Sequence, residues 1–288
     1  MRPFMSCRMA RAATRSAGVV FAFLSAFLFA FLSASSVARA LPARSTADVL
    51  EPGRWSVGAL DPLRVGVARD VELVTHPLLD LALSPNVEAR VALARRGSLR
   101  VSGEYGLSVP TVAMRLTQGY LFPSWKTSDA RVGWFVVPSV GLVASYGERT
   151  VWTGRLEVAT GLSVGRNDAK PLDAWAPLDL LLAPPLTGYR SHLVFGVDHP
   201  LLPWLLGRVS LDGWLIGPSD PPRSQLLFGG SAAFDVKTSQ RTTLTLGAVV
   251  YDYDQHRTEV VRGADGRWLR QRVRNVDVWP MVDFVYRR

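Results

Sequence analysis

The sequence predicts an all-β protein: a single antiparallel, up-and-down transmembrane β-barrel of about 12 strands, within a range of about 10–14. Two observations predict this fold. Apolar and polar residues alternate with a period of two in one segment after another, and from Arg96 onward the connections between these segments alternate between short and long. A closed barrel accounts for both, because a strand in lipid needs a hydrogen-bonded neighbour on each side.

The clearest alternation lies between Trp152 and Val164. Its even-numbered positions are almost all apolar, whereas its odd-numbered positions carry Arg155, Glu157 and small residues. A period of two is that of a β-strand, and at about 3.3 Å per residue this segment is long enough to cross a bilayer with a tilt. We therefore expect Leu156 and Val158 to face lipid, and Arg155 and Glu157 to face the lumen.

Residues 1–40 have the features of a cleavable secretory signal peptide. Four arginines precede an apolar segment from Gly18 to Ser33, and Ala38-Arg39-Ala40 is a small-x-small cleavage site. An uncleaved membrane anchor is the alternative, but the apolar segment is shorter than the ~20 residues that a spanning helix needs. We expect cleavage, which leaves residues 41–288 as the barrel domain.

The charge balance changes when the predicted signal is removed. The chain has 33 Lys+Arg and 24 Asp+Glu, but five of the basic residues and none of the acidic ones lie in residues 1–40. The mature chain is therefore only slightly basic, and its charge indicates no nucleic-acid partner. The single cysteine, Cys7, also lies in the signal, so the mature chain has no disulfide and no thiol chemistry.

The first predicted strands are short, and their alternation becomes regular only from Asn86 onward. The fifth strand could continue past Pro110, since the alternation extends through residues 112–117. The first five ranges are 55–59, 63–67, 71–75, 87–94 and 99–109.

Seven further strands follow, which brings the predicted number to about twelve. Their ranges are 131–146, 152–164, 189–198, 205–216, 225–236, 244–250 and 275–286. The long connections are 119–130, 166–188, 217–224 and 254–272, and the short ones lie near Gly97, Glu148, Leu202 and Thr238. Residues 166–188 are long, apolar and Pro-rich, and they are the candidate for a segment that plugs the lumen.

The signal, about a dozen amphipathic strands, the aromatic residues at the ends of the apolar bands and the alternating connections resemble those of Gram-negative outer-membrane β-barrel proteins. The likeness is one of pattern rather than motif, and it covers nearly all of the mature chain. It implies a place in the outer membrane, contact with its lipid and insertion by the barrel-assembly machinery. One feature departs from the pattern: the chain ends on Arg287-Arg288, with the aromatic Tyr286 two positions early.

The polar faces of the predicted strands carry charges of both signs, which predicts a mixed-charge lumen. These residues are Glu88, Arg90, Arg100, Glu104, Arg155, Glu157, Arg190, Asp198, Arg208, Asp212, Asp235, Asp277 and Asp283. We expect a passive channel for small polar solutes. The alternative is a non-conducting structural or surface-interaction barrel that acts through its extracellular loops, with a lumen closed by ion pairs.

An outer-membrane hydrolase is the third alternative. His192 and Asp198 share a strand face, but six residues separate them by about 20 Å along the strand, so they cannot pair directly. The sequence contains no nucleophile elbow, metal-ligand cluster or phosphate-binding loop. We therefore expect no enzymatic activity, no cofactor and no metal, unless the fold brings a serine, a histidine and a carboxylate together.

Overall fold

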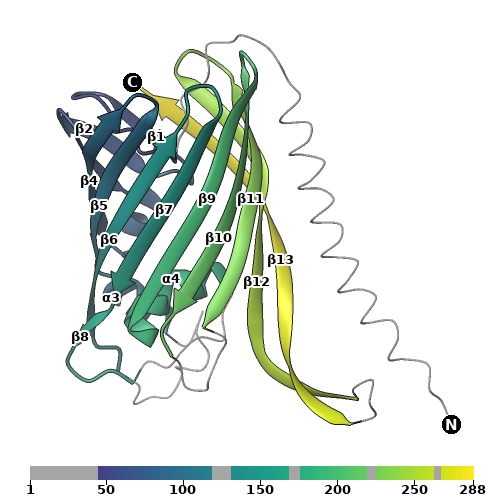
Figure 1. Cartoon of the computed structure of the whole chain (residues 1–288). Helices are drawn as coiled ribbons and strands as arrows, with labels where there is room; N and C mark the ends of the chain where they lie inside the picture. The colour runs from purple at the N-terminus through teal and green to yellow at the C-terminus, as the bar shows by residue number, and fades with distance from the viewer. Residues whose placement is uncertain (1–44, 119–130, 169–175, 219–224, 263–266) are drawn as a thin grey trace.

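Twelve antiparallel strands close into a single barrel, which confirms the predicted fold class (Figure 1). The computed structural model describes residues 45–118, 131–168, 176–218, 225–262 and 267–288, so the predicted signal and the connection at 119–130 lie outside the described residues. The strands are β1 (Trp55–Gly58), β2 (Leu63–Ala68), β3 (Val71–Thr75), β4 (Asn86–Arg96), β5 (Leu99–Ser108), β6 (Trp134–Tyr146), β7 (Val151–Thr160), β9 (Tyr189–Leu202), β10 (Leu205–Ile216), β11 (Leu226–Lys237), β12 (Thr242–Arg262) and β13 (Trp268–Arg287).

The barrel closes where the first strand meets the last. β1 pairs with β13 in antiparallel register, with Ser56 opposite Arg287 and Gly58 opposite Val285. Each other strand pairs with its neighbour in the chain, apart from a short additional strand, β8 (Leu162–Val164), that pairs only with β6. The contact between β1 and β13 closes the ring at the end of β13, whereas the rest of β13 pairs only with β12 among the described residues.

The two ends of the barrel differ as the alternating connections predict. The tight turns lie at one end, beside the C-terminus, and the helices and longer connections lie at the other (Figure 1). We name these the turn end and the loop end. One connection departs from the alternation: residues 59–62 join β1 to β2 by a short turn that lies in the wall near the turn end, because β1 ends at Gly58, opposite Val285 of β13.

The outer surface is apolar, as the alternation predicts. Leu156 has 50% of its surface exposed and Val158 has 38%, and both belong to a band of outward-facing apolar side chains that continues around the barrel. Pairs of aromatic rings border this band near the turn end, with Trp152 and Phe195 at 5.8 Å and Trp55 and Tyr286 at 5.3 Å between ring centroids. An apolar belt with aromatic borders is the surface of a barrel that faces lipid.

The prediction of one strand from Trp152 to Val164 was wrong at its end, where Gly161 separates β7 from β8. The backbone N–H of Gly161 donates to the Gly188 carbonyl at 2.9 Å instead of joining the sheet. A side chain at Gly161 would place its Cβ 2.0 Å from the Pro184 carbonyl oxygen. A helix from the next connection passes at this point, and only glycine leaves room for it.

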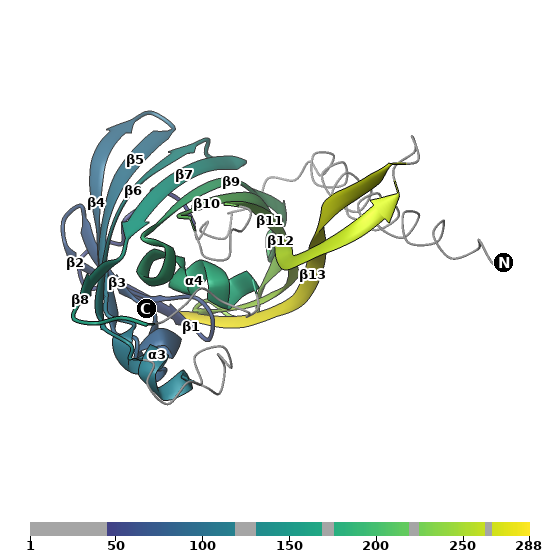
Figure 2. The ribbon, with the colours of Figure 1, turned by 90° about the horizontal axis from the view of Figure 1, so that it is seen from below.

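Helices replace two segments for which the sequence predicted other structure. The suggested continuation of a strand past Pro110 is wrong, because α3 (Thr111–Thr117) begins there. Within the predicted long connection, α4 (Ala176–Thr187) lies inside the ring of strands, as the barrel seen along its axis shows (Figure 2). A third helix, α2 (Pro77–Leu81), is a single turn at the loop end. Among the described residues, no helix is long and apolar enough to span a membrane.

The polar stretch from 254 to 272 is mostly not a loop, contrary to the prediction. β12 continues to Arg262 and β13 begins at Trp268, so the two strands form a hairpin that projects beyond the barrel at the loop end (Figures 1 and 2). β11 pairs with β12 only as far as Asp252. Beyond that point Val260, Arg262, Trp268 and Arg270 are exposed, and the sequence there loses the apolar face by which a strand is recognised.

Candidate functional site

The thirteen charged residues predicted to face the lumen lie on the inner surface of the barrel or against it, and none of them is exposed. Four are buried: Arg90, Glu104, Asp235 and Asp283. Asp283 lines no open path, since its carboxylate accepts the backbone N–H groups of Leu60 (2.9 Å) and Asp61 (3.2 Å) in the β1–β2 connection. The interior is therefore a site built from paired charges.

A row of alternating charges crosses the inner wall from β2 to β5. Arg64 contacts Glu72 at 2.8 Å, and Arg90 reaches the same carboxylate at 3.4 Å from the other side. Arg90 also pairs with Glu104 on the next strand. Arg64 and Glu72 were not predicted, because they lie on short strands whose weak alternation does not mark an inner face.

The row continues across β7 and β9. Arg155 Nε contacts Glu104 at 2.8 Å, and its Nη2 contacts Glu157 at 3.0 Å. Arg190 completes the row by pairing with Glu157 at 2.7 Å. We name this set the charged ladder. Its members are Arg64, Glu72, Arg90, Glu104, Arg155, Glu157 and Arg190, and Glu88 lies beside it at 3.6 Å from Arg90 and 3.8 Å from Arg155.

A second cluster of charges lies on the neighbouring strands from β9 to β12. Arg208 is 3.5 Å from Asp198 and 3.7 Å from Asp235, and the hydroxyl of Thr245 donates to Asp235 at 2.6 Å. Nearer the loop end, Asp277 accepts the Tyr253 hydroxyl at 2.8 Å. Most of the predicted lumen charges are thus held by a partner on another strand.

Residues 45–50 lie inside the lumen at the turn end, and we name them the inner strap. Thr46 and Ala47 are buried, and the Ala47 N–H donates to Ser145 Oγ on β6 at 2.8 Å. The Leu50 N–H donates to Glu72 on β3 at 2.9 Å. The sequence marks this segment only as a polar lead-in, and its place inside the barrel was not predicted.

Charged side chains also hold the inner strap. Arg100 of β5 contacts the Asp48 carboxylate at 3.1 Å, and Arg64 of β2 donates to the Asp48 carbonyl at 2.9 Å. From the opposite wall, Arg208 of β10 donates to Ser45 Oγ at 3.1 Å. The inner strap therefore crosses the lumen between two walls.

α4 occupies the lumen near the loop end. Leu180 and Ala183 pack against Trp214, Ile216 and Leu227 of β10 and β11. On the other side, Leu182 packs against Met114 of α3, Val132 and Phe135. Arg190 of the charged ladder donates to the Leu180 carbonyl at 2.8 Å. The predicted plug is therefore present as a helix, which contacts both sides of the barrel.

A short network of hydrogen bonds holds the loop end together outside the barrel. Asp168 accepts the Arg131 backbone N–H at 3.1 Å and the Arg166 guanidinium at 3.1 Å. The Arg131 hydrogen bond, followed by that of Arg166, lowers the pKa of Asp168 below its ordinary value. These contacts join the segment before β6 to the segment after β8.

His192 has a carboxylate partner that the sequence did not indicate. Its Nε2 lies 2.9 Å from Asp212 on β10, and its ring stacks on Trp214 at 4.8 Å between centroids. Ser210 donates to the other oxygen of Asp212 at 2.9 Å. A hydrolase triad needs its histidine between the serine and the carboxylate, but here the carboxylate lies between the other two. In the described part of the chain, this cluster therefore lacks the order of a catalytic triad.

Between the inner strap and the charged ladder the structure contains a cavity of about 540 Å³. Leu50, Val74 and Val285 supply its apolar wall, and Glu104 and Arg155 lie at its inner end. Among the described residues, no group of three or more His, Cys, Asp or Glu side chains could hold a metal ion. The cavity is thus a chamber within the lumen, lined by both charged and apolar side chains, that opens toward the turn end.

Comparison with known proteins identifies no family for this chain. The sequence matches no family model and no curated protein. Two solved structures of OmpT, an outer-membrane protein of Vibrio cholerae, are similar at 10% and 8% sequence identity, with TM-scores of 0.42 and 0.41. The matches cover 78% and 81% of this chain but only 63% of each OmpT chain. The outer-membrane β-barrel architecture therefore rests on the closed barrel and its apolar belt.

Proposed function

We propose that this protein is an outer-membrane barrel that conducts small polar solutes, and that two segments of its own chain restrict the lumen. The observation that carries the proposal is the cavity of about 540 Å³ between the inner strap and the charged ladder. A purely structural barrel of this size could fill its interior with side chains, but this one retains a chamber lined in part by charged residues. Outer-membrane lipid and the assembly machinery are its expected partners.

The structure also gives a specific reason to consider a non-conducting barrel. The charged ladder joins strands from β2 to β9 through consecutive ion pairs, and such bridges stiffen a wall without requiring a path through it. The two functions differ in what release of the inner strap would do. A channel would then conduct more, whereas a structural barrel would only become less stable.

Weakening the inner strap should therefore increase solute flux. Asp48→Asn removes the carboxylate that Arg100 contacts at 3.1 Å. Replacing residues 45–50 with alternating Gly and Ser, with Gly at 45 and 47, also removes the Ser45 hydroxyl that Arg208 contacts, and the glycines loosen the main chain that Ser145, Glu72 and Arg64 hold. In planar bilayers, we expect low conductance for the unaltered mature chain, a moderate increase for Asp48→Asn and a several-fold increase for the replaced strap.

Asp70→Asn is the matched control for this experiment. Asp70 has an exposed carboxylate at the same end of the barrel, and among the described residues this carboxylate pairs with the exposed Arg69 alone, at 3.9 Å. Its conductance should equal that of the unaltered chain. Unchanged conductance after replacement of the whole strap, in a barrel that is still folded, would refute the channel and favour the structural barrel.

The arrangement in the membrane gives a separate prediction. We expect the loop end to face the cell exterior, because known barrels have short periplasmic turns and longer outer loops. The predicted mature chain has no cysteine, so single cysteines report on one position each. Arg270→Cys should react with an impermeant maleimide on intact cells, whereas Glu148→Cys should react only after the outer membrane is opened. Equal reaction of both on intact cells would rule out this orientation.

A further inference from the structure

Basic side chains outnumber acidic ones at the mouth of the cavity in the lumen. Arg54, Arg241, Arg287 and Arg288 line it at the turn end, where the first and last strands meet. The only acidic side chain that lines this part of the cavity among the described residues is Asp61. Arginine side chains at one opening repel one another, and an anion between them would offset that repulsion.

The inner part of the cavity is different, because its arginines already have partners. Arg64, Arg90 and Arg155 line the cavity, but each belongs to the charged ladder and contacts Glu72 or Glu104. Their charge is largely balanced within the wall. The surplus positive charge therefore lies at the mouth and not in the ladder.

The mouth arginines are placed to contact a ligand. Within the described ranges, Arg54 and Arg288 form no ion pair, and the Arg241 side chain makes only a long hydrogen bond, 3.5 Å, to the Tyr286 hydroxyl. All three are exposed. The Arg288 main chain is fixed by two 2.9 Å hydrogen bonds with Trp55, so the C-terminus is held at the mouth. A guanidinium presents its N–H donors in a planar fork that matches a carboxylate or a phosphate.

The walls behind these arginines would suit the carbon skeleton of a small solute. Leu50, Val74 and Val285 line the cavity and supply apolar surface next to the charged mouth. A cavity of about 540 Å³ lies in the range of about 300–1,000 Å³ that is usual for small-molecule sites. The cavity thus combines an anion-binding rim with an apolar wall.

We propose that this cavity is a binding site for small organic anions that carry a carboxylate or a phosphate group. The inference rests on the proposed function and deepens it, because it states that the conducted solutes are anions. In this arrangement the mouth arginines capture the anionic group from the periplasmic side, and the apolar wall holds the rest of the molecule. Arg100, which holds Asp48 of the inner strap, shows that the same lumen already binds a carboxylate in this way.

Calorimetry on the full mature chain in a zwitterionic detergent tests the site without a membrane. The probes are succinate for a carboxylate, inorganic phosphate for a phosphate, and glucose as a neutral solute of similar size. We expect saturable binding of one or both anions and none of glucose, with an affinity that decreases as salt is added. Binding of succinate alone or of phosphate alone would support the site and identify which group it accepts.

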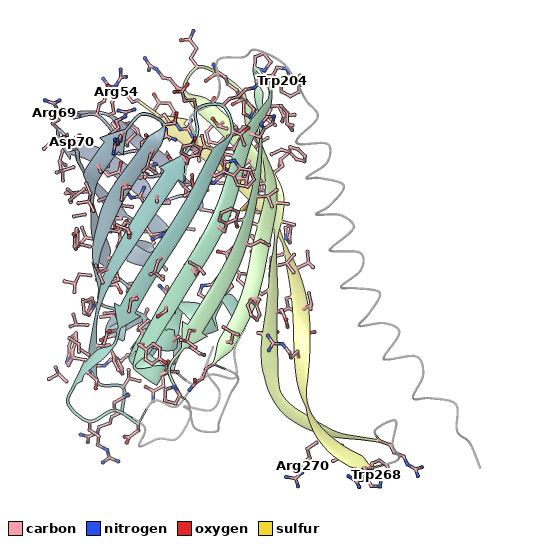
Figure 3. All side chains as sticks on the ribbon, viewed as in Figure 1. Arg54, Arg69, Asp70, Trp204, Trp268 and Arg270 are labelled. Atoms are coloured by element: carbon pink, nitrogen blue, oxygen red, sulfur yellow. The ribbon has the colours of Figure 1, made fainter. Side chains whose placement is uncertain are left out.

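The variants separate the cavity from general surface charge. Arg54→Gln together with Arg241→Gln should weaken anion binding by about tenfold or more, because each removes a charge-assisted donor. Arg69→Gln is the matched control: Arg69 is an exposed arginine at the same end, outside the cavity (Figure 3), and its removal should leave binding unchanged. An equal loss in the control would overturn the proposal, as would the absence of saturable anion binding by the folded chain.

The two proposals fail in different ways. Anion binding in detergent without conductance, even after replacement of the inner strap, would leave the binding site and refute the channel. Conductance without anion binding would leave the channel and refute the site. In a channel with this site, single-channel recordings should also favour anions over cations, and the double variant should lose that preference.

Discussion

Replacing Glu104 with glutamine should destabilise the barrel by about 3–5 kcal/mol, because it removes the negative partner of a buried ion pair and leaves the arginines in place. The Glu104 carboxylate is 2% exposed and lies between Arg90 and Arg155, with Arg155 Nε at 2.8 Å. Glutamine has nearly the same shape, so packing is preserved while the negative charge is lost. Its amide group would also direct N–H donors toward guanidinium groups that can only donate.

Urea unfolding of the barrel from phospholipid vesicles measures this change in the free energy of unfolding. Glu88→Gln is the matched control, since Glu88 contacts the same two arginines at 3.6 and 3.8 Å but is 22% exposed. It should cost less than about 1 kcal/mol, because partly solvated pairs at such distances contribute little. Similar losses for both variants would mean that position within the charged ladder does not determine stability.

The sequence could predict the barrel because alternation with a period of two shows which face of each strand contacts lipid. Leu156 and Val158 face outward, and Arg155 and Glu157 lie on the inner side, as predicted. The count of twelve depended on including the short first segments, and the first of them, β1, pairs with β13 and closes the ring. What the pattern could not show is where a strand ends, as the interruption at Gly161 illustrates.

The interior was less predictable, because it depends on contacts between distant parts of the chain. α4 is apolar on all sides, so its sequence has no period that separates a buried helix from an apolar loop. The inner strap has no pattern at all, and only the positions of Ser145, Glu72 and Arg100 explain its path. A polar segment gives no sign of such partners in the sequence.

The partners of the charged residues in the lumen also could not be predicted from the sequence. Alternation identifies the inward face of each strand, but pairing depends on the register between neighbouring strands, and a single sequence does not determine it. His192 shows this well: Asp198 on its own strand was too far away, yet the β9–β10 register brings Asp212 to 2.9 Å. The residue types in the site were therefore predictable, whereas its connections were not.

Introducing arginine at Leu156 should destabilise the barrel by about 2–4 kcal/mol, the cost of a charge on the lipid face near the midplane. Leu156 is 50% exposed on the outer surface and lies within β7, opposite Leu142 of β6 and Leu193 of β9. Arginine there must either leave its charge in hydrocarbon or stretch toward a distant interface. Unfolding from phospholipid vesicles measures the cost.

Leu99→Arg is the control for depth, because Leu99 also faces outward, with 42% exposure, but begins β5 next to the tight turn at Gly97. Near the membrane surface the charge can reach water, so the expected cost is at most about 1 kcal/mol. In a lipid-free detergent that surrounds the barrel with a thin, adaptable layer, the difference between the two variants should shrink. Equal costs in vesicles would show that the apolar belt does not span the bilayer, because only a membrane makes the same substitution depend on its depth.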